Sequence, residues 1–179
     1  MTDDAAGAAV PAPRDDLLAA VREIDRHAAQ GGWDQAPRLY ALVPTDELLR
    51  AEPSLADTLG PEVGAALTPV EQEDLPLDEP LSDLLARIEW PAEVVGCALV
   101  METVSLPDDA VPPEDADAAG AWAATHPRRE EGRLTVGVLR DGSRASALRW
   151  RSFDSEADII VSPELAPTLS DALATTLDG

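Results

Sequence analysis

The stretch EGRLTVGVLRDGSRASALRWRS, residues 131–152, predicts two β-strands joined by a tight turn at Asp141-Gly142. The length of that turn matters, because changing it by one residue reverses which side chains share a face of the sheet. A two-residue loop would place Val136 on the same face as Arg149, whereas a three-residue loop places it on the same face as Trp150. We expect the three-residue loop, since it gathers the more apolar side chains on one face and since a glycine bulge suits such a turn.

The expected register gives the hairpin two unlike faces. The apolar face consists of Leu134, Val136, Val138, Ser146, Leu148 and Trp150. The less apolar face consists of Arg133, Thr135, Gly137, Ala147, Arg149 and Arg151. Strands joined by a tight hairpin cannot be parallel, so this segment favours an antiparallel sheet.

Arginine is concentrated in and beside this hairpin. Seven of the 13 arginines lie between Arg128 and Arg151 together with three acids, a local balance of +4 in a chain of net charge −22, so the rest of the chain carries −26. Either these arginines pair with acids of neighbouring elements, or they form an open sheet face that recognises a carboxylate, a phosphate or an acidic peptide. The candidate anion- or partner-binding residues of that face are Arg133, Arg149 and Arg151. If the face is functional, replacing Arg149 and Arg151 with serine should abolish the capture of a partner and hardly change the melting temperature.

Apolar periodicity predicts the elements on both sides of the hairpin. The resulting fold class is α+β, with a mostly antiparallel sheet of four to five strands and helices packed mainly on one face. Residues 61–80 are expected to form a long connection with at most one helical turn at 68–71, because four prolines and six acids lie there. Strands are expected at 38–43, 93–106 and 159–161, and helices at 15–30, 45–52, 54–60, 80–90, 113–124 and 162–177, the last capped by Ser162 with Pro163 in its first turn.

Composition, apolar runs and net charge together indicate the domain organisation, the location and the kinds of partner to expect. Residues 1–13 are predicted to be a disordered lead, and residues 14–179 to form a single α+β domain. The N-terminus lacks the features of a signal peptide, and the longest apolar run, 94–101, is too short to span a bilayer, so a cytoplasmic protein is expected. A net charge of −22 argues against nucleic acid and anionic membranes as partners.

Motifs for catalysis, cofactors and metals are missing from the sequence. A chain without lysine can form neither a P-loop nor a Schiff base, and no G-x-S-x-G elbow is present. Two histidines about 100 residues apart and a single cysteine make a zinc site dependent on long-range coincidence. We therefore predict no catalytic, cofactor-binding or metal-ligating residue, and we expect Cys97 to be a small buried apolar side chain.

The sequence also resembles a known family. The resemblance lies in the segments GWDQAPRLYALVPTDELL (32–49), LTPVEQEDLP (67–76), IEWPAEVVGCALVMETVSLP (88–107), LTVGVLRDGSRASALRWR (134–151) and ELAPTLSDALATTL (164–177). Together these segments resemble a family of small acidic proteins that is widespread in actinobacteria and has no assigned function. The resemblance implies a high-GC actinobacterial source, which fits the absence of lysine and asparagine, and a cytosolic protein. It implies no activity, and it identifies no site residue.

Two classes of function fit these observations. We favour a non-enzymatic protein-interaction or regulatory domain that binds another protein or forms a homodimer. The alternative is a small-ligand (anionic) binding protein, or a cryptic enzyme, that uses the arginine-rich hairpin face or a pocket near Trp33, Trp90 and Trp150. A closed pocket with convergent polar groups would favour the alternative, whereas a flat apolar patch would favour the interaction domain.

Overall fold

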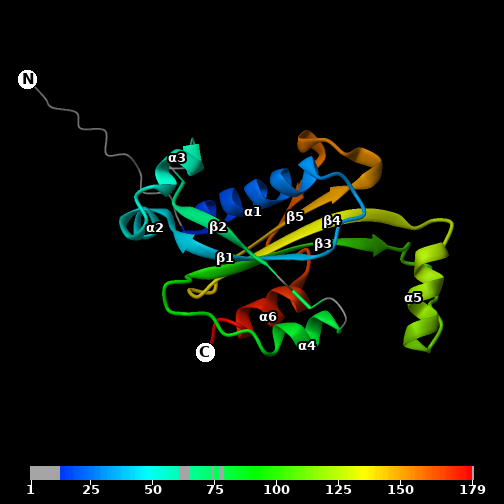
Figure 1. Cartoon of the computed structure of the whole chain (residues 1–179). Helices are drawn as coiled ribbons and strands as arrows, with labels where there is room; N and C mark the ends of the chain where they lie inside the picture. The colour runs from blue at the N-terminus through cyan, green and yellow to red at the C-terminus, as the bar shows by residue number, and fades with distance from the viewer. Residues whose placement is uncertain (1–12, 61–64, 74, 77–78, 179) are drawn as a thin grey trace, which may run out of the picture.

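Six strands form one sheet in the computed structural model, which describes residues 13–60, 65–73, 75–76 and 79–178 (Figure 1). The strand order is β2-β1-β3-β4-β5-β6, and every pair of neighbours is antiparallel. The strands are β1 (Arg38–Pro44), β2 (Leu67–Gln72), β3 (Gly96–Ser105), β4 (Glu130–Leu139), β5 (Arg144–Trp150) and β6 (Ile160–Val161).

Six α-helices connect and flank these strands. They are α1 (Pro13–Gln30), α2 (Thr45–Ala51), α3 (Leu55–Leu59), α4 (Leu81–Leu85), α5 (Ala116–Thr125) and α6 (Pro167–Thr175). Two 3₁₀ turns, Arg151–Phe153 and Glu156–Asp158, connect β5 to β6. No helix of the described residues has the length and the apolar character needed to cross a membrane.

The hairpin has the three-residue loop that the sequence predicts. Leu139 and Ser143 close the loop with a backbone hydrogen bond of 3.0 Å, and Gly142 adopts the left-handed φ of 87° that glycine tolerates best. Val136 pairs with Ser146, and Gly132 pairs with Trp150. Trp150 therefore shares a face with Val136, which confirms the predicted register.

The prediction of four to five strands is wrong, because residues 67–72 form a sixth strand where we expected a connection. Pro69 obscures this strand in the sequence, since proline cannot donate to a sheet ladder. The strand β2 lies at the edge of the sheet and pairs only with β1, and edge strands tolerate proline. The predicted disordered lead falls on residues outside those described, except for Pro13, which begins α1. The predicted connection also includes residues 61–64, 74 and 77–78, which likewise lie outside the described residues.

The prediction that helices pack mainly on one face is also wrong, because helices cover both faces (Figure 1). The helix α1 packs on the face that carries Ala98 and Ala147, whereas α4 and α6 pack on the face of Leu99 and Val136. Small residues allow α1 to approach its face closely. A Cβ atom at Gly137 would lie 2.8 Å from Val21 Cγ2. Of the less apolar hairpin face, every residue except Arg151 is buried.

The helices on the two faces differ in length. At about 1.5 Å per residue, the 18 residues of α1 extend about 27 Å, whereas the nine residues of α6 extend about 14 Å. The ten residues of β3 and of β4 extend about 33 Å. The helix α6 is short because it begins at Pro167 and not at the predicted Ser162 cap. Together with α4 it buries Leu99 and Val136 on this face, whereas Leu148 and Ile160 lie outside that cluster.

Candidate functional site

Arg149, one of the three predicted binding residues, is buried in an ion pair. Its side chain lies beneath α1, where Nη2 and Nε donate to Asp25 Oδ2 at 2.6 and 3.1 Å. Asp25 is 0% exposed and Arg149 is 3% exposed. A third bond of 3.2 Å joins Nη1 to Asp154, which also accepts from the Trp33 indole at 2.9 Å. These bonds from Trp33 and Arg149 lower the pKa of the Asp154 carboxyl.

Arg133 is buried next to Arg149 on the neighbouring strand. It is 2% exposed, its Cζ lies 4.5 Å from the centroid of the Trp33 ring, and it donates to the carbonyl of Gly32. Its guanidinium lies 3.7 Å from Glu102, which accepts the backbone N–H of Asp34. The sheet arginine thus fixes the loop that follows α1.

Arg151 is the only one of the three with a substantially exposed side chain, at 40%. It binds both carboxylate oxygens of Asp34 at 3.0 Å and one of Glu131 at 2.8 Å. The bonds and charge of Arg151 lower the pKa of Asp34. An anion that approaches Arg151 would have to compete with both carboxylates.

Pairing within the chain extends to the other hairpin arginines. Arg128 pairs with Asp109, Arg129 with Glu131 and Arg144 with Asp171, while Arg140 donates to the carbonyls of Trp90, Pro91, Val94 and Leu177. These contacts support the interpretation that the arginines neutralise acids of neighbouring elements. Recognition of an anionic ligand by Arg133, Arg149 and Arg151 stays a prediction.

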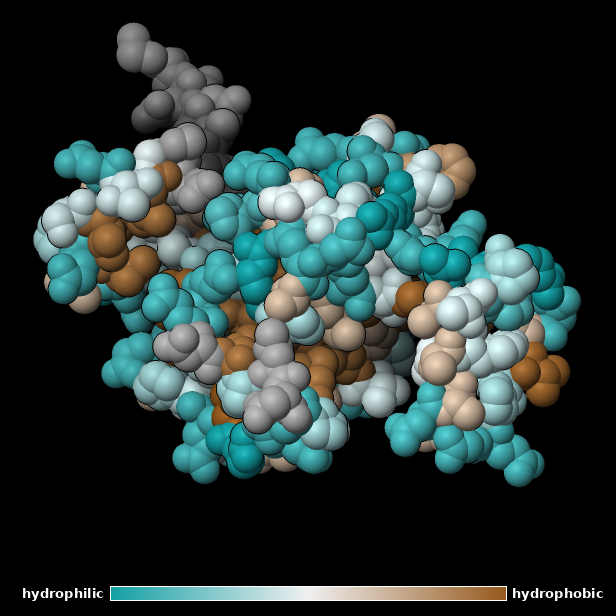
Figure 2. All heavy atoms as spheres, turned by 45° about the vertical axis from the view of Figure 1, so that its right-hand side comes forward, coloured by the Kyte–Doolittle hydropathy of each residue, from teal (hydrophilic) through white to brown (hydrophobic). Residues whose placement is uncertain are grey.

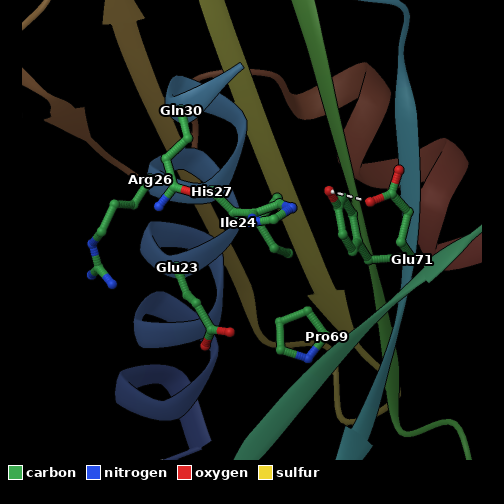
Figure 3. A pocket seen from close by; sticks show the side chains of 8 residues that line it. Glu23, Ile24, Arg26, His27, Gln30, Pro69 and Glu71 are labelled. Carbon is green, nitrogen blue, oxygen red and sulfur yellow. Dashed lines mark hydrogen bonds between the residues drawn. The ribbon is translucent and has the colours of Figure 1, made fainter. Parts of the chain in front are cut away.

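A second candidate is the groove between α1 and β2 (Figure 3). His27 points across it from the last turn of α1, whereas Arg26 points away and pairs with Glu156 at 3.1 Å. Tyr40 donates to Glu71 at 3.3 Å. The groove has a volume of about 260 Å³, which is below the 300–1,000 Å³ typical of small-molecule sites.

The side chains that line this groove limit the reactions it could catalyse. Burial raises the pKa of Tyr40 to about 12, so the phenol remains protonated near neutral pH and cannot act as a base. The described residues that line it include no serine, threonine, cysteine or lysine that would serve as a nucleophile. Nowhere do the described residues bring three metal-ligating side chains together. Cys97 is buried as predicted, and burial raises its pKa to about 11.

The third candidate is an apolar surface on the α6 face of the sheet. Direct strand partners place four large apolar side chains in one line across β3, β4, β5 and β6, and we call this line the apolar row. Ile160 is 45% exposed, and the other members are half-buried. The apolar row consists of Met101, Leu134, Leu148 and Ile160.

Trp150 enlarges this surface. A Cβ atom at Gly132 would lie 3.0 Å from both the Trp150 ring and Leu148 Cδ1, so these two side chains lie over the glycine. In the described part of the chain, neither Leu148 nor Trp150 belongs to a buried cluster. The strand pattern placed Leu134, Leu148 and Trp150 on one apolar face, but it could not show that Leu134 packs against the buried cluster of α4 and α6 whereas Leu148 and Trp150 lie outside it.

A projecting arm, residues 106–129, borders the apolar row. This arm connects β3 to β4 and contains α5, which extends away from the sheet (Figure 1). All ten residues of α5 are described and none of them is buried. Pale and brown side chains of the arm are separated from the body by a notch in the surface (Figure 2). The arm contains five acids, all between Pro107 and Pro127, and two arginines, Arg128 and Arg129, at its C-terminal end.

The fold and these surfaces define a class of protein: a three-layer α+β protein with an antiparallel sheet, an arm, and an apolar sheet surface next to it. A family model described as PPA1309-like protein matches residues 17–178, and the chain belongs to that family. No curated protein and no solved structure matches it. The match confirms that the chain is a member of a family, and the family's description states no activity.

Proposed function

We propose that this protein is a non-enzymatic protein-interaction domain that binds a partner protein through the apolar row and Trp150. The observation that carries the proposal is the line of partly exposed side chains from Met101 to Ile160, in which Met101 and Leu134 pack against the buried cluster of α4 and α6 and Leu148 and Ile160 lie outside it. Contiguous exposed apolar surface of this kind is characteristic of interaction sites.

The edges of the sheet are less suited to binding a partner strand. Pro69 interrupts the donors of β2 at one edge, and β6 at the other edge is only two residues long. A partner is therefore expected to lie on the face of the sheet and not to extend it.

Site-specific photo-cross-linking in the native cell tests the proposal. The photoreactive residue p-benzoylphenylalanine replaces Ile160 on the apolar row, or Val104 as a matched control. Val104 is 41% exposed and lies on the opposite face of the same sheet, because it pairs with Glu131 on β4. We expect a discrete protein adduct from position 160 that is absent from position 104.

The partner identified by mass spectrometry is then purified and titrated against wild type, I160D and V104D. We expect I160D to weaken binding at least tenfold, since it places a charge in the apolar contact, and V104D to bind as wild type does. Equal adducts at the two positions, or equal affinities of the two variants, would contradict the proposal.

A further inference from the structure

We infer that the partner segment is a basic amphipathic α-helix that lies across the apolar row with its charged flank against the arm. This inference rests on the proposed function and adds the chemistry of the occupant. It depends on three features of the molecule: the shape of the uncovered surface, its charge, and the charge of the whole chain.

The shape favours a helix. On this side of the sheet the second layer is made of helices, because α4 and α6 pack there against Leu99 and Val136. The apolar row is the next line of side chains along the strands, since Met101 follows Leu99 by two residues on β3. A helix continues that layer by placing its apolar stripe on the row.

The charge favours a basic flank. The arm carries five acids and two arginines, Arg128 and Arg129, so its formal charge is 2 − 5 = −3, and it borders one end of the apolar row. Asp115 caps α5 by accepting from Ala118, and Asp109 pairs with Arg128. The other three acids, Asp108, Glu114 and Asp117, have exposed side chains. Arginine or lysine side chains on one edge of a bound helix would reach these carboxylates.

The charge of the whole chain argues against a second copy as the occupant. Two copies would each have a net charge of −22, and a two-fold interface on this face would bring two acidic arms together. A basic helix is attracted and not repelled, because the negative potential around the chain draws it in and accelerates its association.

Binding of synthetic peptides to the full chain tests this inference. The probe is a labelled 18-residue peptide with leucines at positions i, i+3, i+4 and i+7 and arginines on both flanks. Its controls are the same peptide with glutamates in place of arginines and one with the leucine positions shuffled. We expect the basic amphipathic peptide alone to bind with micromolar affinity in fluorescence anisotropy, and I160D, but not V104D, to weaken it at least tenfold.

The contribution of the arm is measured with two charge variants that change the net charge equally. D108N/E114Q/D117N removes three acids of the arm, and E47Q/E52Q/D57N removes three exposed acids of the α2–α3 region, at the other end of the molecule (Figure 1). We expect the arm variant to weaken peptide binding about fivefold or more at 50 mM salt and little at 500 mM, where charges are screened within a few ångströms. The variant of the α2–α3 region should weaken peptide binding by less than half as much as the arm variant does.

Three results would overturn the inference. The acidic peptide could bind as tightly as the basic one, both charge variants could lose the same peptide affinity, or the protein could self-associate through Ile160. If the cross-linked partner binds at Ile160 but the basic peptide does not, only the chemistry of the occupant is wrong. If neither the partner nor the peptide depends on Ile160, the proposed function fails as well.

Discussion

Arg149 shows how the hairpin arginines act on stability. Its guanidinium and the Asp25 carboxylate are both buried, so each carries a desolvation cost, which Asp25 and Asp154 offset for Arg149 and Arg149 offsets for Asp25. Asp25 Oδ1 has no hydrogen-bond partner among the described residues. The pair is therefore more important for holding α1 in one position on β5 than for net stability.

Replacing Arg149 with serine should destabilise the protein by about 3–5 kcal/mol, because the change leaves a buried carboxylate unpaired. The matched control is Arg144→Ser on the same strand, where the pair with Asp171 is partly exposed and its loss should cost less than about 1 kcal/mol. Chemical denaturation of both variants measures the difference. Equal stabilities would indicate that Arg149 is free to serve a ligand, as the alternative function requires.

Asp154 should make stability depend on pH. The Trp33 indole and Arg149 lower its folded-state pKa below the unfolded value of about 3.9. A lowered pKa means that the stabilisation is complete above the unfolded pKa and is lost as the pH falls through the folded pKa. The denaturation midpoint of wild type should thus fall from pH 6 to pH 3, and Asp154→Asn should show a smaller fall. The control variant Asp57→Asn, at an exposed position, should show the same fall of the denaturation midpoint from pH 6 to pH 3 as wild type.

At the scale of elements, the packing of α1 on β4 depends on a single missing methyl group. Gly137→Ala would place a Cβ atom 2.8 Å from Val21 and 3.0 Å from Leu17, both of which are buried. We expect a loss of about 1–3 kcal/mol, because the helix must move or the side chains must leave their rotamers.

Gly120→Ala provides the matched control for this substitution. Gly120 lies within α5, and a Cβ atom there would meet nothing within 4 Å. Alanine favours a helix over glycine by about 1 kcal/mol, so this variant should be neutral or slightly more stable. A Gly137→Ala variant as stable as wild type in thermal denaturation would show that α1 packs on the sheet less closely than the structure indicates.

At the scale of the whole molecule, the arm and the sheet are expected to be separable. Ser105 and Glu130 are direct partners at the ends of β3 and β4, so a two-residue Asn-Gly turn can replace residues 106–129. The melting temperature should change by less than about 4 °C, because the removed residues include no buried side chain among those described. Binding of the basic peptide should weaken in this variant. A collapse of stability would instead assign the arm to the folded core.

Local patterns were sufficient for most of the elements. The alternation along β4 and β5 and the Asp141-Gly142 turn predicted the hairpin register, and helical spacing predicted α1. These features depend on residues close in the chain. The edge strand β2 was missed, because Pro69 is compatible with a strand only where no second neighbour requires its N–H group, and strand order is a property of the whole sheet.

The candidate surface required the tertiary structure. Sequence reasoning placed Leu134, Leu148 and Trp150 on one face, and it gathered Arg133, Arg149 and Arg151 on the other. Which face is covered depends on where the helices pack and on long-range pairs such as Asp25 with Arg149, which lie 124 residues apart. Periodicity thus determines which side chains share a face, whereas only the packing of α1 and α6 against the sheet decides which of those faces meets solvent.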